Sequence, residues 1–528
     1  MRRSIALAAV VALTMAACGG DDDDDADSAT TDGAAPATDA GSSATTAAPA
    51  SSSADSPATT GGATGDTSDS GDSGGSSAGS AGCPAIDDSV DEVAGSGAGR
   101  FLSDIACTAD APLEAEGEPV IIGFQNPEGD PNGSFPEATL GTQAAVDYIN
   151  AELGGWGADI QNGVPGRPIQ LEVCKTAISP DDSQRCANEL VAKDPEIIVS
   201  SINFFGNHLP IFEAAGIPAF VTSPVTIADF TSTWAYAIAG GGGCLGQHTA
   251  LVDFATSDLE ATRVAVPWAD TPPGVVCYYD LENKPLDVLA GRVEGTSERA
   301  GSIPDLETIG VPIKPATPDV TPQVTQILDF DPDAIIFSAQ GADCWNLVDG
   351  LGRLGWTPEQ IPLVLSGACV DFEAMAAAGD LANGIYFVTS GGSNTNDLAS
   401  ITDPVALAEA ELFQTKPIEY GMTEADLYKG FGATGFNSML ALWALSTRVV
   451  EAGDELTPTT FRDFVAQSDG EHLYGSTPLS CADAPPPYVA VCNTINTVNQ
   501  WDGTNLVPVR EAFSGADLIA GTELKPGP

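Results

Sequence analysis

The sequence predicts an α/β fold with two lobes, each built on a parallel sheet. Short apolar runs alternate with amphipathic stretches from about residue 119 to residue 366. This alternation is typical of βαβ units, which place helices on both faces of a parallel sheet. The chain has 528 residues, whereas a single hydrophobic core stops growing at about 250 to 300 residues. We therefore expect two α/β lobes.

The first series of elements opens with Val120-Ile121-Ile122-Gly123-Phe124, a continuous apolar run that predicts a strand buried on both faces. A helix should follow, because Leu140, Ala144 and Tyr148 recur at helical spacing and Gly154-Gly155 would end it. The series continues with a strand at 169–173, a helix at 180–191, a strand at 196–200, a helix at 208–215 and a strand at 219–222.

A second series begins after the glycines at 240–243. It consists of a helix at 245–256, a strand at 263–267, a helix at 281–299, a strand at 308–313, a helix at 319–328, a strand at 333–338, a helix at 344–354 and a strand at 363–366. Pro322 suits the first turn of its helix, where a backbone N–H would have no partner. The repeated order predicts a second parallel sheet.

The N-terminus carries the pattern of an export signal. Arg2 and Arg3 precede an apolar run at 5–17, which is too short to span a bilayer as a helix. Met15-Ala16-Ala17-Cys18 resembles a bacterial lipobox, in which the cysteine is acylated and becomes the new N-terminus. We interpret residues 1–17 as a lipoprotein signal peptide. Lipid on Cys18 would anchor the chain to the outer face of the bacterial cell membrane.

Residues 18–82 read as a disordered tether. After Cys18 the segment consists almost wholly of Gly, Ser, Ala, Thr, Asp and Pro, with no lysine, arginine or aromatic residue. Such a composition cannot bury enough apolar area to offset the entropy of ordering. Residues 83–116 are expected to form a small disulfide-closed extension before the first strand.

The charge balance excludes two classes of partner. The chain has 74 acidic and 19 basic residues and a net charge of −55. A protein that binds nucleic acid or an anionic membrane surface would need the opposite sign. We attribute the acidity to a solvated surface suited to solubility or to a salty habitat.

The cysteines predict disulfides. Removing the lipidated Cys18 from the eleven cysteines leaves an even number in an exported chain, which favours five bridges. The spacing suggests nearest-neighbour pairs: Cys83–Cys107, Cys174–Cys186, Cys244–Cys277, Cys344–Cys369 and Cys481–Cys492. No C-x-x-C occurs and the chain has three histidines, so neither a zinc site nor any cofactor is expected.

The order of several motifs resembles a known family. Asp147-Tyr148-Ile149-Asn150-Ala151 ends the first long helix, and Gly163-Val164-Pro165-Gly166-Arg167-Pro168 leads into the second strand. Ala214-Ala215-Gly216-Ile217-Pro218 precedes a later strand. Together with the first strand, these segments resemble the branched-chain amino-acid receptor family over about residues 117–470. Members of that family are extracytoplasmic solute-binding proteins of ABC importers with the class I periplasmic-binding fold.

The resemblance implies two Rossmann-like lobes joined by a three-strand hinge, with crossovers near 239–243, near 387–391 and after 475. Lobe 1 would comprise residues 117–240 and 389–475, lobe 2 residues 241–388, and residues 476–528 would complete the lobes. It also implies a monomer that passes a small-molecule solute to an ABC permease in the membrane and catalyses no reaction.

Ligands of open parallel sheets lie beyond the carboxyl ends of the strands, near helix N-termini. The candidate ligand-binding residues therefore lie in the loops after strands: Asn132, Ser134, Phe135, Asn203, Phe204, Ser223 and Thr226 in lobe 1, and Asp270, Thr271, Gln340 and Asp371 in lobe 2. Several of them are also ordinary capping or turn residues.

The resemblance leaves the solute open. Amino-acid receptors of the family hold the ligand carboxylate with lobe 1 groups, and Ser223 and Thr226 lie in the matching loop. They usually meet the ammonium group with an acid from lobe 2. Gly367 or Ala368 occupies that position here, and Asp371 is the nearest acid. A branched-chain amino acid is the first hypothesis, and an amide or urea-type solute is the alternative.

Other readings are weaker. Gly241-x-Gly243-x-x-Gly246 fits a dinucleotide fingerprint, but it lies at the expected lobe crossover and lacks the acidic residue that should end the next strand. Gly75-x-Ser77-x-Gly79 fits a hydrolase motif without the strand and helix that the motif requires. A secreted enzyme would need convergent catalytic groups. A sensory ligand-binding module should be followed by a transmembrane helix, and no apolar run of that length follows Cys18.

Overall fold

The computed structural model describes residues 112–160, 162–238, 240–390, 398–400, 404–469, 479–482, 484 and 487–523. All of them belong to one compact unit, Ser76–Pro528. The predicted signal peptide, the tether, Cys18 and the Cys83–Cys107 pair lie outside the described residues. Among the helices that are described, none is both long enough and apolar enough to cross a membrane.

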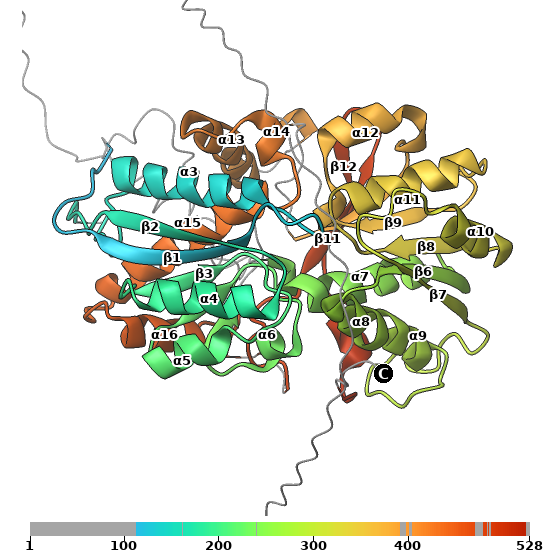
Figure 1. The fold of residues 1–528 in the computed structure, drawn as a ribbon, viewed down its shortest axis with the longest axis horizontal. Coiled ribbons are helices and arrows are strands. Elements are labelled where there is room, and N and C mark those ends of the chain that lie inside the picture. Colours follow the sequence, from blue (N-terminus) through green and yellow to red (C-terminus); the bar gives the residue numbers. More distant parts are fainter. Residues whose placement is uncertain are drawn as a thin grey trace, which may run out of the picture. The chain divides into compact units, whose positions relative to one another are not determined.

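Lobe 1 is built on a parallel sheet, which is five-stranded over the described residues, in the order β2-β1-β3-β4-β5 (Figure 1). Its strands are β1 (Val120–Pro127), β2 (Ile169–Thr176), β3 (Ile197–Ser200), β4 (Ala219–Val221) and β5 (Ala235–Ala237). Each neighbouring pair is parallel. The predicted strands and their order along the chain agree with this sheet.

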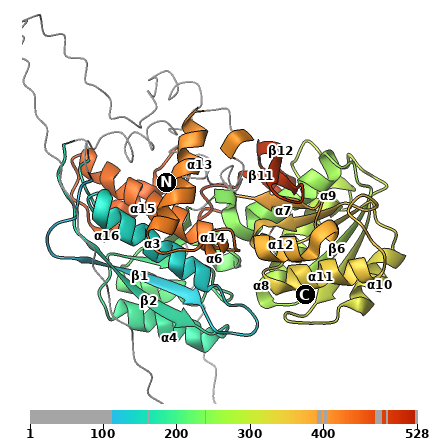
Figure 2. The same cartoon turned by 90° about the horizontal axis from the view of Figure 1, so that it is seen from above.

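Helices cover both faces of the lobe 1 sheet, as Figure 2 shows for α3 and α15 on one face and α4 on the other. The helices of lobe 1 are α3 (Pro136–Glu152), α4 (Pro180–Val191), α5 (Leu209–Ala215), α6 (Ile227–Thr231), α13 (Pro404–Glu419), α14 (Glu424–Leu427), α15 (Gly432–Glu451) and α16 (Pro458–Ala466). Alternate strand residues divide between the faces: Val199 packs toward α3 and α15, and Ile198 toward α4 and α5. This alternation explains why the strands read as continuous apolar runs.

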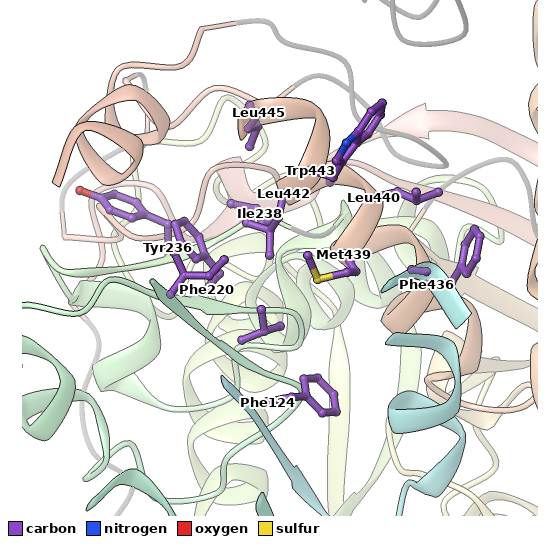
Figure 3. Packing of buried hydrophobic residues seen from close by; sticks show 14 of the residues in the cluster. Phe124, Phe220, Tyr236, Ile238, Phe436, Met439, Leu440, Leu442, Trp443 and Leu445 are labelled. Carbon is purple, nitrogen blue, oxygen red and sulfur yellow. The ribbon is translucent and has the colours of Figure 1, made fainter. Parts of the chain in front are cut away.

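Helix α15 forms the centre of the lobe 1 core. Figure 3 shows its side chains Met439 and Leu442 gathered with Phe220 and Ile238, all of them buried in one cluster. A Cβ added at Gly141 of α3 would lie 2.2 Å from the carbonyl oxygen of Gly432. Glycine at this position therefore lets the two helices approach closely.

Lobe 2 is built on a mixed sheet, seven-stranded within the described ranges, in the order β12-β11-β10-β9-β8-β6-β7. Its strands are β6 (Arg263–Ala269), β7 (Glu307–Ile313), β8 (Ala334–Phe337), β9 (Leu363–Ser366), β10 (Tyr386–Thr389), β11 (Asn496–Trp501) and β12 (Leu506–Phe513). Strands β6 to β10 are parallel, whereas β11 is antiparallel to β10 and β12 is antiparallel to β11. The C-terminal segment thus extends the lobe 2 sheet.

Two sets of helices sandwich the lobe 2 sheet. One face carries α10 (Thr321–Asp329), α11 (Ala342–Arg353) and α12 (Phe372–Ala378), and the other carries α7 (Gly243–Ser257), α8 (Pro272–Tyr278) and α9 (Lys284–Leu289). The helix expected at 281–299 was placed wrongly. It starts as α8 at Pro272, continues through a π-helical turn at Tyr279–Asn283 and ends with α9 at Leu289. Thr271 caps this helix and Pro272 occupies its first position.

Three crossovers join the lobes and lie together. The first is the glycine turn η2 (Gly240–Gly242), the second follows β10, and the third lies between Val491, which bridges to β5, and β11. Gly241 has φ +78°, and a Cβ there would lie 2.7 Å from both Asn496 Oδ1 and Ser390 Cβ. The glycine motif therefore serves backbone bending where the three chain segments meet.

Four disulfides link the described cysteines: Cys174–Cys186, Cys244–Cys277, Cys344–Cys369 and Cys481–Cys492. They are four of the five pairs expected from the sequence. Cys244–Cys277 joins α7 to α8, and Cys344–Cys369 joins α11 to the short helix η4 (Gly367–Cys369) that follows β9. Both of these bridges lie next to the cavities described below.

Candidate functional site

The loops at the carboxyl ends of strands from both lobes enclose a cleft. In lobe 1 these loops follow β1, β3 and β4, and in lobe 2 they follow β6, β8 and β9. Three adjoining cavities make up the cleft, and Ala368 and Phe431 border all three. We call them the Glu137 cavity, the Ser223 cavity and the Asn437 cavity.

The Glu137 cavity has a volume of ≈ 230 Å³. Lobe 1 lines it with the β1–α3 loop and with residues 429–431, and lobe 2 lines it with the loops after β8 and β9. An Asx-type turn shapes the β1–α3 loop: Asp130 Oδ1 accepts from the backbone N–H of Asn132 at 2.8 Å. Asp130 Oδ2 accepts from the N–H of Ile178 at 2.9 Å, which ties the loop to the start of the next helical segment.

The Ser223 cavity has a volume of ≈ 90 Å³ and a wall that combines apolar and polar side chains. Phe204 and Val225 of lobe 1 face this cavity together with Pro273 and the Cys244–Cys277 disulfide of lobe 2. The polar residues that line it include Ser223, Thr271, Gln247, His248, Ser338, Gln340 and Asp343. An apolar wall with a few convergent polar groups is typical of a small-molecule site.

The Asn437 cavity has a volume of ≈ 50 Å³ and lies beside the crossovers, since Thr389 and Ser390 line it together with Asn437 of α15. Here the lobes also touch directly. The N–H of Gly430 donates to the carbonyl of Val370 at 3.0 Å, and the rings of Phe372 and Tyr428 stack at 4.7 Å. These contacts join the loop before α15 to the loop after β9.

Most of the predicted ligand-binding residues line the cleft. Asn132, Ser134, Phe135, Gln340 and Asp371 line the Glu137 cavity, and Phe204, Ser223, Thr271 and Gln340 line the Ser223 cavity. Thr271 and Asp371 also cap helices: the Thr271 side chain accepts from Gly274 N–H and the Asp371 side chain from Ala374 N–H, each at 3.0 Å. Capping and lining are compatible, because a helix N-terminus faces the cleft in both cases.

Three predicted residues do not line these cavities. Asn203 supports the β3 loop by accepting from the N–H groups of Phe205 and Gly206. Thr226 forms a capping box with Asp229 at the start of α6. Asp270 is exposed after β6. Asn203 and Thr226 thus shape the loops that carry Phe204 and Ser223.

Burial and hydrogen bonds set the charge of the acids in the cleft. Burial alone would raise the pKa of Asp130, but the N–H groups of Asn132 and Ile178 outweigh it and lower the pKa. Burial raises the pKa of Asp343, and the hydrogen bond from Ala316 N–H only partly offsets this. Burial also raises the pKa of Glu137, whose carboxylate receives the N–H of Phe431.

His248 lies on α7 in the wall of the Ser223 cavity, with Nδ1 2.9 Å from Oε1 of Glu282. Burial raises the pKa of Glu282, and the neighbouring imidazole offsets this rise only in part. The ligand atoms of His248, Cys244 and Cys277 lie close enough together to hold a metal ion. The two sulfurs are joined in a disulfide, so they are not the thiolates that a metal would bind.

Sequence reasoning missed several residues of the cleft. Gln247 and His248 sit about one turn into α7, beyond the crossover, and no motif marks them. Phe431 comes from a loop between two helices in the last part of lobe 1, so strand patterns could not indicate it. Glu137 follows the predicted loop directly, at the first turn of α3, and extending that loop by two residues would have found it.

The fold and the cleft define a two-lobed binding protein. The sequence matches the family model described as periplasmic binding protein over residues 119–281 and 293–482. The chain therefore belongs to the periplasmic binding protein family, as the resemblance predicted. It is a solute-binding protein rather than an enzyme. The comparison with curated proteins gives no match.

Solved structures of low sequence identity share the fold. A branched-chain amino acid ABC transporter protein from Thermus thermophilus with bound valine is 14% identical, with 77% of this chain and 98% of that chain covered and a TM-score of 0.57. An ABC transporter substrate-binding protein from Sphaerobacter thermophilus is 19% identical, with coverages of 76% and 99% and a TM-score of 0.56. A solute-binding protein from Rhodopseudomonas palustris, in complex with 4-hydroxybenzoate, is 15% identical, with coverages of 75% and 97% and a TM-score of 0.56.

Proposed function

We propose that the chain captures a small polar solute, an amino acid of the branched-chain type, between its lobes and delivers it unchanged to an ABC import permease. The observation that carries this proposal is the cleft itself, which both lobes line with the loops at the carboxyl ends of their strands. A ligand that contacts both lobes favours the closed arrangement, and that differential contact can drive closure.

We choose an amino acid because the Ser223 cavity combines apolar side chains with polar groups. In the Ser223 cavity, Phe204, Val225 and Pro273 offer an apolar wall for an aliphatic side chain. The hydroxyl of Ser223 in the same wall can donate to a carboxylate. The T. thermophilus structure contains valine and the R. palustris structure contains an aromatic acid, so the fold accommodates solutes of this size.

An amide or urea-type solute is the second candidate. Gly367 and Ala368 stand where amino-acid receptors of this type usually carry an acid. Gln340, which carries an amide group, lines both the Glu137 cavity and the Ser223 cavity. A neutral solute would need only such hydrogen-bonding partners.

The proposal places the protein outside the cytoplasm. Residues 1–17 would direct export, lipid on Cys18 would anchor the chain, and residues 18–82 would hold the folded part away from the membrane as a monomer beside its permease. Mass spectrometry of the membrane-extracted protein tests the anchor. The expected N-terminal peptide begins at Cys18 with a diacylglyceryl group, and an unmodified Cys18 would contradict it.

A thermal-shift screen of amino acids, amides, urea and polyols tests the binding function. A solute at a hundredfold excess over its Kd should stabilise the protein by about 2.7 kcal/mol. We expect leucine, isoleucine or valine to raise the melting temperature most. An amide that raises it while the amino acids do not would favour the second candidate, and no shift with any solute would contradict both.

A further inference from the structure

Glu137 is buried in the wall of the Glu137 cavity with part of its carboxylate unpaired. The residue is 4% exposed, and its Oε2 atom has no hydrogen-bond partner among the described residues. Burial raises the pKa of Glu137, and the backbone N–H groups of Glu137 and Phe431 and the charge of Lys429 offset this only in part. A buried carboxylate oxygen without a donor costs free energy unless a ligand supplies one.

The chain approaches this carboxylate very closely. Gly430 has φ +46°, and a Cβ at that position would lie 2.8 Å from Glu137 Oε1. A side chain at residue 430 would therefore push the loop away from Glu137. The glycine lets residues 429–431 close over Oε1 of Glu137, a residue that lines the cavity.

The surroundings of Glu137 are acidic. The described residues that line the cavity include the carboxyl groups of Asp130, Glu137, Asp343 and Asp371 and a single cationic side chain, Lys429. Asp130, Asp343 and Asp371 each accept backbone N–H groups from neighbouring loops or helix starts. These hydrogen bonds give the three aspartates a structural role, whereas Oε2 of Glu137 accepts no hydrogen bond from the described residues. A cleft lined by one sign of charge raises the local concentration of solutes of the opposite sign.

We infer that Glu137 is a specificity-determining residue that receives a cationic nitrogen of the solute. The group is an ammonium or guanidinium that enters the Glu137 cavity and donates to the Glu137 carboxylate. This assignment rests on the proposed function and deepens it, because it selects solutes with a cationic nitrogen over neutral amides and over carboxylates without one. The ammonium is then met by an acid of lobe 1, while the lobe 2 position at Gly367 and Ala368 carries none.

Isothermal titration of the full mature protein at pH 7.5 tests the inference with two sets of probes. The cationic set is L-leucine, L-lysine and 1,4-diaminobutane, and the other set is 4-methylpentanoate, acetamide and urea. The wild-type protein should bind at least one cationic probe and should bind it more tightly than any member of the other set. Glu137→Gln should weaken that binding about 10- to 100-fold, the usual range for a hydrogen bond to a charged group.

Two further variants separate a binding role from a structural one. Glu213→Gln removes the same charge from an exposed position on α5 and should leave the affinity unchanged. Glu137→Asp keeps the charge and should bind more tightly than Glu137→Gln. A Glu137 that only supports its loop would shift the melting temperature of Glu137→Gln without changing selectivity between the probe sets.

Each outcome has a clear meaning. Binding of a cationic probe that Glu137→Gln leaves within twofold of wild type overturns the inference. Tightest binding of acetamide, urea or 4-methylpentanoate also overturns it, while the proposed solute-binding function stands. Absence of binding by every probe would count against both.

Discussion

Lobe 2 presents its side of the cleft on helix ends and loops joined by disulfides, whereas lobe 1 presents its side on loops held by hydrogen bonds. Cys244 and Cys277 line the Ser223 cavity themselves, and Cys344–Cys369 joins the residues next to Asp343 and Ala368. Within the described residues, the lobe 1 loops that line the cavities carry no disulfide. Instead, Asp130, Asn203 and Asp229 accept the backbone N–H groups of those loops.

This difference teaches that one wall should respond to reduction and the other to pH. A disulfide fixes its loop whatever the protonation state, but fails under a reducing agent. An ionisable side chain such as Asp130 or Asp229 accepts these N–H groups best when it is ionised, so its hold on the loop depends on pH.

Removing the Cys244–Cys277 bridge should have the largest effect. The bridge closes a sequence separation of 33 residues, so Cys244→Ser with Cys277→Ser should lower the free energy of unfolding by about 4 kcal/mol. Solute affinity should also fall, because both cysteines line the Ser223 cavity. Urea unfolding and calorimetric titration measure the two quantities.

Cys174–Cys186 provides the matched control, since it joins β2 to α4 and does not line the three cavities. Its removal should cost less stability, given a separation of 12 residues, and should leave affinity unchanged. Equal losses of affinity in the two double variants would mean that the bridge at the cleft has no special role.

The buried His208 should make lobe 1 sensitive to acid. Burial lowers the pKa of His208 to about 3, and neither ring nitrogen has a hydrogen-bond partner among the described residues. The unfolded chain binds the proton with a pKa of about 6.5, so stability is full above pH 6.5 and is lost as the pH falls toward 3. Between pH 7.5 and pH 5 the loss should be about 2 kcal/mol from this residue.

His208→Phe keeps a ring at the edge of Phe212 and removes the titration. The variant should lose about 2 kcal/mol less than wild type over the same pH interval, measured by urea unfolding at each pH. Parallel pH profiles for the two proteins would show that the buried imidazole does not control the acid sensitivity.

The crossover glycine should have the smallest effect. Gly241→Ala adds a Cβ at a positive φ and brings it within 2.7 Å of Asn496 Oδ1 and Ser390 Cβ. Gly453 also has a positive φ, of +84°, but a Cβ there would meet nothing within 4 Å. We expect Gly241→Ala to lose about 1 kcal/mol more stability than Gly453→Ala. Equal losses would indicate that only backbone strain matters at the crossover.

The sequence predicted the two sheets well because buried parallel strands leave continuous apolar runs. The helix predicted at 281–299 was wrong. The helix in this region begins at Pro272 and ends at Leu289. Phe431 and Lys429 could not be predicted, since they reach the cleft only because α15 packs on α3 from a distant part of the chain. The loops after strands were predictable because a parallel sheet brings its carboxyl ends to one edge.

Within those loops, the sequence could not separate lining residues from supporting ones. Asn203 and Ser223 are equally polar and follow neighbouring strands. Asn203 is 4% exposed and turns back onto its own loop, whereas Ser223 lines the cavity. That choice depends on the tertiary arrangement of the loops, which residue type alone does not encode.

The most direct test of the central claim is the affinity of Phe431→Ala for the amino acid that stabilises the wild-type protein most. Phe431 borders all three cavities and packs edge-on against Phe135 at 5.0 Å. Leu354→Ala, at a 44% exposed position after α11, is the control. If the solute binds between the lobes, Phe431→Ala should bind at least about 10-fold more weakly, because an aromatic contact is lost, while Leu354→Ala binds normally. Wild-type affinity in a folded Phe431→Ala protein would contradict the account.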